Sequence, residues 1–179
     1  MKHDHSILGM DAAEVLRERA ESLAQVSEEE AALDLQAMLL FRLGEEWYAF
    51  LIEQVLEIYN EYRIAPIPRV PEFILGVINI RGEIVSVTDI ARLMRVSSSE
   101  SDARGEQSAI VVTNDTCTSA VVVDEIGDII EVPAGSIEPP LAVVDKSQSE
   151  WVSGSVYVEG RLIGIINLDK VLEPIGENE

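Results

Sequence analysis

Four acidic side chains in one short stretch are the residues of this sequence best suited to acid/base chemistry. Asp124 and Glu125 are adjacent, and Asp128 and Glu131 follow closely. Paired carboxylates could transfer protons or hold a divalent cation. Adjacent residues of a strand, however, point to opposite faces of the sheet. In a chain with 33 acidic residues, we therefore expect these carboxylates to be solvated and not to form a catalytic pair.

Other candidates for catalysis and metal binding are weaker. His3 and His5 lie near the N-terminus, and without a cysteine or a third histidine beside them they make a poor metal site. The part expected to fold has no histidine to activate a serine, and the sequence contains no phosphate-cradling, zinc-protease or nucleophile-elbow motif. The sequence therefore predicts no catalytic residue, no metal and no cofactor, and we expect the protein not to be an enzyme.

An arginine in "GVINIRGEIVSVTDI", residues 76–90, is the strongest candidate for a binding residue. Arg81 and Gly82 are expected to form a two-residue hairpin loop, with glycine at the second position, where a type I′ turn needs positive φ. The guanidinium can then project past the sheet and pair with a carboxylate of a partner. Solubility alone would also explain an exposed turn arginine, so the pattern leaves both interpretations open.

The same hairpin pattern occurs twice. Residues 76–94 align without gaps on residues 154–172 at an offset of 78, and the second turn is Glu159-Gly160. A capping residue and a short helix follow each hairpin, and the two caps are Asp89 and Asn167. Cross-strand pairing places eight aliphatic side chains on matching faces: Ile78, Ile80, Val85, Val87, Val156, Val158, Ile163 and Ile165.

The upstream segments also correspond, since residues 51–59 align on residues 122–130 at an offset of 71. We therefore interpret the chain as two copies of one β unit, roughly 37–96 and 107–174. Units of this size are marginally stable alone, so the copies should share a third apolar layer and fold as one body. The residues expected to contribute to that layer from the second hairpin face are Val77, Ile84 and Leu162.

Short β-rich runs separated by Gly, Pro, Asn and Asp predict a mainly β fold, as a small barrel or sandwich. These runs include residues 37–43, 46–52, 76–80, 84–88, 108–113, 119–124, 154–158 and 161–166. Residues 1–36 are instead rich in Ala, Glu and Leu and predict a helical extension, which either packs loosely on the body or docks a partner. The polar segment 97–107 is expected to be a mobile loop, and 175–179 a C-terminal tail.

Composition restricts the class of partner. The chain has 179 residues, 47% of them hydrophobic, and a formal charge of −20, which disfavours nucleic acid and anionic membranes and favours proteins as partners. Its apolar runs are too short to insert into a bilayer, and no export signal precedes them, so we expect a cytoplasmic protein. Cys117 is the only cysteine, which excludes an internal disulfide, and we expect it to be a semi-buried strand residue.

Two long stretches of this sequence resemble the CheW family of chemotaxis coupling proteins. They are "LLFRLGEEWYAFLIEQVLEI" (39–58) and "PEFILGVINIRGEIVSVTDI" (71–90), and the likeness extends over about residues 37–174. The resemblance implies one CheW-like domain made of two intertwined SH3-like five-stranded β-barrels with a hydrophobic groove between them. It also implies a non-enzymatic bacterial adaptor that joins the histidine kinase CheA, through its regulatory domain, to the cytoplasmic tips of methyl-accepting chemoreceptors in membrane-associated arrays.

The resemblance also assigns roles to individual residues. The arginine and turn glycine of the family fall on Arg81 and Gly82, and the partner-binding "V-EI" element falls on Val55, Glu57 and Ile58. The family's aspartate after the second hairpin strand falls on Asp89, where it is expected to cap a helix.

Two features depart from a minimal coupling protein, namely the long N-terminal extension and the polar 97–107 segment. They leave open which receptor, kinase or array is served, and an adaptor of a surface-motility or second-messenger pathway would have the same sequence pattern. A β protein that holds a small molecule between its barrels is an alternative of a different class.

Overall fold

The computed structural model describes residues 34–96, 107–140 and 149–173. The expected C-terminal tail and nearly all of the expected helical extension and 97–107 loop lie outside the described residues. The first strand begins at Leu35, so Leu35 and Gln36 lie in a strand although the expected extension included them. Both residues pair with the last part of β8. This pairing extends β1 toward the N-terminus beyond the apolar pattern from which its start was predicted.

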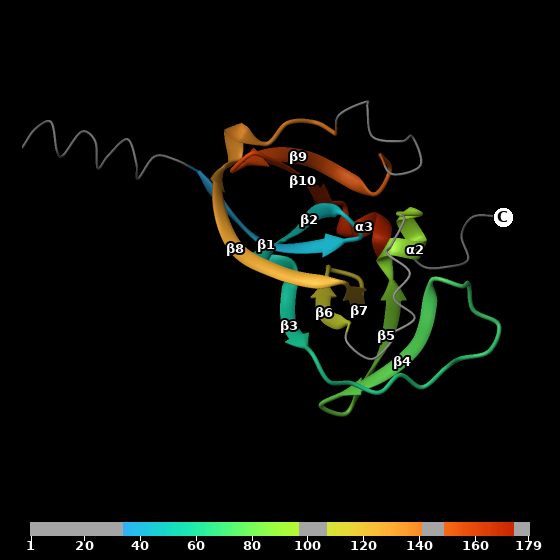
Figure 1. Cartoon of the computed structure of the whole chain (residues 1–179). Coiled ribbons are helices and arrows are strands. Elements are labelled where there is room, and N and C mark those ends of the chain that lie inside the picture. Colours follow the sequence, from blue (N-terminus) through green and yellow to red (C-terminus); the bar gives the residue numbers. More distant parts are fainter. Residues whose placement is uncertain (1–33, 97–106, 141–148, 174–179) are drawn as a thin grey trace, which may run out of the picture. The chain divides into compact units, whose positions relative to one another are not determined.

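The described residues form ten strands, two short α-helices and two single-turn 3₁₀ helices (Figure 1). The strands are β1 (Leu35–Leu43), β2 (Glu46–Leu51), β3 (Val55–Tyr59), β4 (Ile74–Ile80), β5 (Glu83–Asp89), β6 (Ser108–Thr113), β7 (Thr118–Val123), β8 (Glu125–Pro133), β9 (Val152–Val158) and β10 (Arg161–Ile166). The helices are η1 (Ile52–Gln54), α2 (Ile90–Met94), η2 (Ala134–Ser136) and α3 (Leu168–Val171). The expectation of a mainly β fold is confirmed.

The two copies exchange strands. One sheet has the order β8-β1-β2-β10-β9 and the other β3-β6-β7-β5-β4. Each sheet therefore combines the first two strands of one copy with the last three strands of the other, and the two orders match strand for strand (Figure 1). Because β3 pairs only with β6 and β8 only with β1, neither copy can complete a sheet by itself.

Three apolar layers follow from this exchange. The strands β1, β2, β6 and β7 are apolar on both faces, since alternate residues enter different clusters. In β6, for example, Ile110 and Val112 join a central cluster, whereas Ala109 and Val111 join the cluster of their own sheet. The central cluster also takes residues from β1, β2, α2 and α3, so it is the layer that both copies share. The sheet that contains β1 and β2 has a third cluster around Met38.

The prediction of which residues form the shared layer was wrong. Ile84 and Leu162 are 66% and 44% exposed, and Val77 is only half-buried. Their strands lie at or near one edge of each sheet, so their outward side chains face away from the other sheet.

The two hairpins have matching geometry. Arg81 and Gly82 have φ of 52° and 94°, and Glu159 and Gly160 have φ of 49° and 80°, as a type I′ turn requires at both positions. Of the eight aliphatic residues expected to face the core, six are buried and two, Ile80 and Val158 beside the turns, are half-buried.

Closed barrels are not confirmed. Each sheet ends in two edge strands, and no pairing joins these edges within the described ranges. In each copy, an isolated β-bridge instead ties the segment that precedes the hairpin to the first strand of that hairpin. Ala65 bridges to Val77 in the first copy, and Glu138 to Ser155 in the second. The sheets are therefore open along their edges, with one local backbone contact on the hairpin of each.

Candidate partner-binding surface

The arginine at the first hairpin turn forms an ion pair with a residue of a distant strand. Arg81 Nη2 lies 2.5 Å from Glu57 Oε1, although β3, which carries Glu57, and the β4–β5 hairpin lie at opposite edges of their sheet. The two residues were both predicted to contact a partner, and the structure places them in contact with each other. The Arg81 side chain is 78% exposed and that of Glu57 29%, so the ion pair lies at the surface.

Two further residues hold this ion pair in place. Tyr59 Oη donates a hydrogen bond to Glu57 Oε2, and Arg81 Nη2 lies beside the other oxygen, Oε1. The backbone N–H of Gly82 donates to Asn79 Oδ1 at 2.9 Å, which fixes the turn. We call Glu57, Tyr59, Asn79, Arg81 and Gly82 the tip surface. The sequence analysis did not predict Tyr59 as part of this surface. It could have been predicted, because residues two apart on a strand share a face and Tyr59 lies two residues after Glu57.

The hydroxyl of Tyr59 is held in its protonated state. Its hydrogen bond to the Glu57 carboxylate raises its pKa above the ordinary value of 10.0, partial burial raises it further, and the Arg81 charge lowers it. Tyr59 therefore stays a hydrogen-bond donor throughout the physiological range.

The other predicted partner-binding residues differ in accessibility. Ile58 is 43% exposed and can contact another protein. Val55 is half-buried and packs against the central cluster, so most of its surface is already used within the fold. Leu56, which was not predicted, is 55% exposed, because exposure alternates along β3 and Leu56 lies on the outward side with Ile58.

The second copy lacks the ion pair of the tip surface. The residues at the matching places are Glu159 and Asp128, two carboxylates. The nearby cation, Arg161, instead lies over the Trp47 ring at 5.3 Å from its centroid. The duplication thus produced one hairpin tip with an arginine–glutamate pair and one with acidic residues.

A cleft of about 520 Å³ contains residues from both copies. Ile74 and Leu93 come from the first copy and Trp151 and Leu172 from the second. Three hydroxyls in the lining, those of Ser86, Thr88 and Ser119, are hydrogen-bonded to one another at 3.0 and 3.2 Å. The cleft is thus mainly apolar with a small polar area whose groups already have partners.

Cys117 also lines this cleft, and its predicted position was wrong. It is exposed and lies in the turn between β6 and β7, not within a strand. Asn114 accepts hydrogen bonds from the backbone N–H groups of Thr116 and Cys117, which ends β6 before the cysteine.

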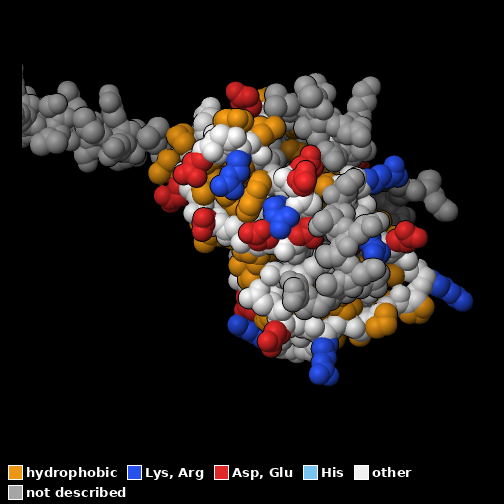
Figure 2. Space-filling view, viewed as in Figure 1, with side chains coloured by type: hydrophobic (Ala, Val, Ile, Leu, Met, Phe, Trp, Pro, Cys, Tyr) orange, Lys and Arg blue, Asp and Glu red, His pale blue; other side chains and the backbone are white. Residues whose placement is uncertain are grey.

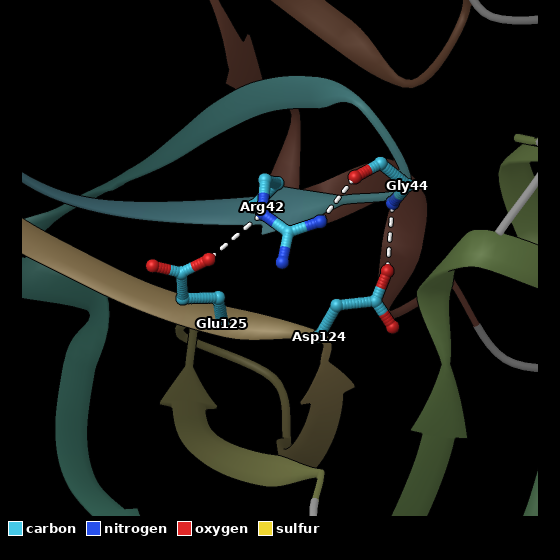
Figure 3. A network of polar contacts seen from close by, with 4 residues as sticks. All are labelled: Arg42, Gly44, Asp124 and Glu125. Atoms are coloured by element: carbon cyan, nitrogen blue, oxygen red, sulfur yellow. Dashed lines mark hydrogen bonds and ion pairs between the residues drawn. The ribbon is translucent and has the colours of Figure 1, made fainter. Parts of the chain in front are cut away.

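Two of the four acidic candidates hold the fold together where the chain crosses from one sheet to the other (Figure 3). Asp124 Oδ2 accepts a hydrogen bond of 2.7 Å from the N–H of Gly44, and Arg42 Nε donates to Glu125 at 2.8 Å. The prediction that all four are solvated was therefore wrong for Asp124, which is half-buried; Asp128 and Glu131 are exposed.

The two capping predictions can be located in the structure. Asp89 accepts a hydrogen bond from the N–H of Arg92 at the start of α2, and Asn167 accepts one from the N–H of Lys170 at the start of α3. Both helices bury apolar residues in the central cluster, so the caps position elements that the two copies share.

The described residues contain no group of three His, Cys, Asp or Glu side chains that could hold a metal ion. None of the helices in the described ranges is long and apolar enough to cross a membrane. On the face drawn in Figure 2, the described Lys and Arg side chains stand singly among acidic, apolar and uncharged groups. The open swapped sheets, the exposed tip surface and the cleft together define a protein that offers binding surfaces.

Comparison with known proteins identifies the family. The model of the CheW-like domain matches residues 37–175, so the chain belongs to this family. This family consists of non-catalytic chemotaxis adaptors, which confirms that the chain is an adaptor and not an enzyme.

Three relatives illustrate the likeness. The chain is 28% identical over 142 residues to chemotaxis protein CheW of Rhizobium meliloti (strain 1021), covering 79% of this chain and 90% of that protein. It is 30% identical over 142 residues to protein FrzA of Myxococcus xanthus, covering 77% and 86%. The crystal structure of scaffolding protein TtCheW from Thermoanaerobacter tengcongensis superposes with a TM-score of 0.70 at 29% identity, covering 80% of this chain and 97% of that one.

Proposed function

We propose that this chemotaxis adaptor binds the regulatory domain of the histidine kinase CheA through the tip surface and the cytoplasmic tip of a methyl-accepting chemoreceptor through the cleft. Binding to both would couple receptor state to kinase activity without any catalytic step. The observation that carries the proposal is the exposed Arg81–Glu57 ion pair on a turn whose backbone is fixed by Asn79. Charged groups on a rigid tip set the orientation of a complex and its specificity more than its raw affinity.

The assignment of the receptor to the cleft is based on its lining. An apolar groove of this kind fits the apolar face of an amphipathic helix, and the Ser86, Thr88 and Ser119 hydroxyls in its lining are already paired, so an apolar occupant leaves none of these hydroxyls unsatisfied. We place the protein in the cytoplasm, recruited to membrane-associated receptor arrays. The SH3-like barrel form and the N-terminal helical extension stay predictions.

The small-molecule alternative is not favoured by the family match, which is to adaptors. A CheW-like adaptor of a motility or second-messenger pathway remains an alternative assignment, because it would use the same two surfaces with different partners.

Two variants that each damage one surface test the proposal. Arg81→Glu should weaken binding of the purified kinase regulatory domain by at least about tenfold, because two carboxylates would then face each other at the tip. Ile67→Asp, at a cleft residue that is 40% exposed, should weaken binding of a receptor-tip fragment by at least about tenfold while changing folding little. Isothermal titration calorimetry would measure all four affinities.

Each variant also serves as the control for the other, since it should retain the binding that the other loses. Two further controls are matched in structure. Arg95→Glu changes another exposed arginine with a left-handed backbone, at φ of 56°, and should leave kinase binding intact. Ile129→Asp changes an isoleucine that is 61% exposed on β8 and should leave receptor binding intact. Equal binding by wild type and Arg81→Glu would refute the role of the tip surface.

A further inference from the structure

The hydroxyl of Tyr59 determines how Glu57 can bind Arg81. A carboxylate has two oxygens that can each accept a hydrogen bond or pair with a cation. Here Glu57 Oε2 accepts the hydrogen bond from Tyr59 Oη, while Oε1 lies 2.5 Å from Arg81 Nη2. The guanidinium carries five N–H donors, and the Arg81 side chain is 78% exposed, so a partner can reach the guanidinium.

Tyr59 is itself held by the fold. It pairs with Ala109 of β6, and its ring packs, half-buried, against the cluster that includes Ile78 and Val85. Its hydroxyl therefore has a fixed position at the edge of the core, whereas the Glu57 carboxylate and the Arg81 guanidinium lie at the surface. An anchored donor can hold a mobile carboxylate in one orientation.

We propose that Tyr59 is a positioning residue of the tip surface: by holding Glu57 Oε2 it fixes the carboxylate beside Arg81 and so orients the guanidinium that binds a carboxylate of the kinase domain. This inference rests on the proposed function of the tip surface. Without the Tyr59 hydroxyl, the Glu57 carboxylate can rotate, and the Arg81 guanidinium loses the fixed orientation that the partner needs.

The chain contains a matched control for this inference. Tyr48 Oη donates to Glu46 Oε2 at 2.8 Å, so β2 carries the same tyrosine–glutamate pair at the same spacing. Glu46 makes no ion pair among the described residues. Tyr48→Phe therefore removes the same kind of hydrogen bond without affecting an arginine.

The experiment titrates the purified kinase regulatory domain into the full chain as wild type, Tyr59→Phe, Tyr48→Phe and Arg81→Glu, with the unfolding midpoint of each variant measured alongside. Phenylalanine keeps the ring within its cluster, so the fold should be retained. We expect Tyr59→Phe to raise Kd about three- to tenfold, the size of one ordinary hydrogen bond, and Tyr48→Phe to leave Kd within about twofold.

A second measurement separates positioning from a structural role. In a Glu57→Ala background there is no carboxylate to orient, so adding Tyr59→Phe should leave the affinity of that variant unchanged. Equal weakening with and without Glu57, or equal weakening by Tyr59→Phe and Tyr48→Phe, would mean that the hydroxyl acts only on stability and would overturn the inference.

The outcomes distinguish the two proposals. If Arg81→Glu loses binding while Tyr59→Phe binds as wild type does, the inference about Tyr59 is wrong and the function of the tip surface stands. If wild type and Arg81→Glu bind the kinase domain equally, the proposed function of the tip surface fails and the inference fails with it.

Discussion

Both hairpin turns hold a charged residue where the backbone is left-handed. Arg81 and Glu159 have φ of 52° and 49°, a conformation that costs a residue with a Cβ about 1–2 kcal/mol and that asparagine or glycine adopts more easily. At Arg81 the strained position directs the side chain to Glu57. Glycine or asparagine would therefore suit the first position of this turn better than arginine does. A strained residue of this kind is expected where its side chain is needed for a contact.

A glycine in the first strand of each hairpin allows the segment that precedes the hairpin to approach that strand closely. A Cβ on Gly76, whose φ is +143°, would lie 2.2 Å from the carbonyl oxygen of Ala65, which accepts a hydrogen bond from Val77. The matching Gly154 would place a Cβ 3.0 Å from the carbonyl oxygen of Glu138. The repeated glycine thus reflects a repeated backbone contact.

Gly76→Ala should lower the free energy of unfolding by about 3 kcal/mol or more, because a backbone oxygen cannot move aside and the φ is unfavourable for alanine. Urea denaturation would measure this. Gly135→Ala is the control, since a Cβ there meets nothing within 4 Å, and it should change stability by less than about 0.5 kcal/mol. Equal effects of the two substitutions would show that the Ala65 contact is not tight.

At the scale of elements, the sequence predicts what depends on local pattern. The alternation of Ile78, Ile80, Val85 and Val87 and the turn glycine predict the first hairpin, and Asp89 predicts the helix start, because these signals span only a few residues. The contact between Glu57 and Arg81 is not predictable in this way, since it requires two edges of a sheet to approach each other. The exchange of strands also escapes local pattern, because β6 would be equally apolar on both faces whichever copy it joined.

The two caps make a prediction at this scale. Asp89 Oδ1 accepts from the N–H of Arg92 at 3.0 Å, and α2 buries Ile90 and Met94 in the central cluster. Asp89→Ala should therefore lower the free energy of unfolding by about 1 kcal/mol, measured by urea denaturation. Asp89→Asn keeps an oxygen acceptor and should cost less than half as much. If both substitutions cost the same, the charge and its ion pair with Arg92 at 3.1 Å would matter more than the cap.

The described residues from Leu35 onward form one interlocked unit, because the two copies complete each other's sheets. The first copy buries one face of β1 and β2 against strands of the second copy, and the second copy buries one face of β6 and β7 against strands of the first. The opposite faces of these four strands lie in the shared central cluster. A unit of roughly 60 residues buries too little apolar surface to be stable alone, and here the exchange also withholds hydrogen-bond partners. The surfaces of the two copies are therefore fixed relative to one another by the core itself, as a coupling function between two partners requires.

Cutting the chain between the copies tests this interdependence. Fragments 1–100 and 101–179 each lack the strand that pairs with one of their own, since β3 needs β6 and β8 needs β1. Each fragment alone should show no cooperative unfolding by circular dichroism, and mixing them should restore a cooperative transition and a one-to-one complex in analytical ultracentrifugation. A fragment that unfolded cooperatively as a monomer would show that one copy can pair its own strands, in which case the core would no longer explain why the two binding surfaces hold a fixed relation.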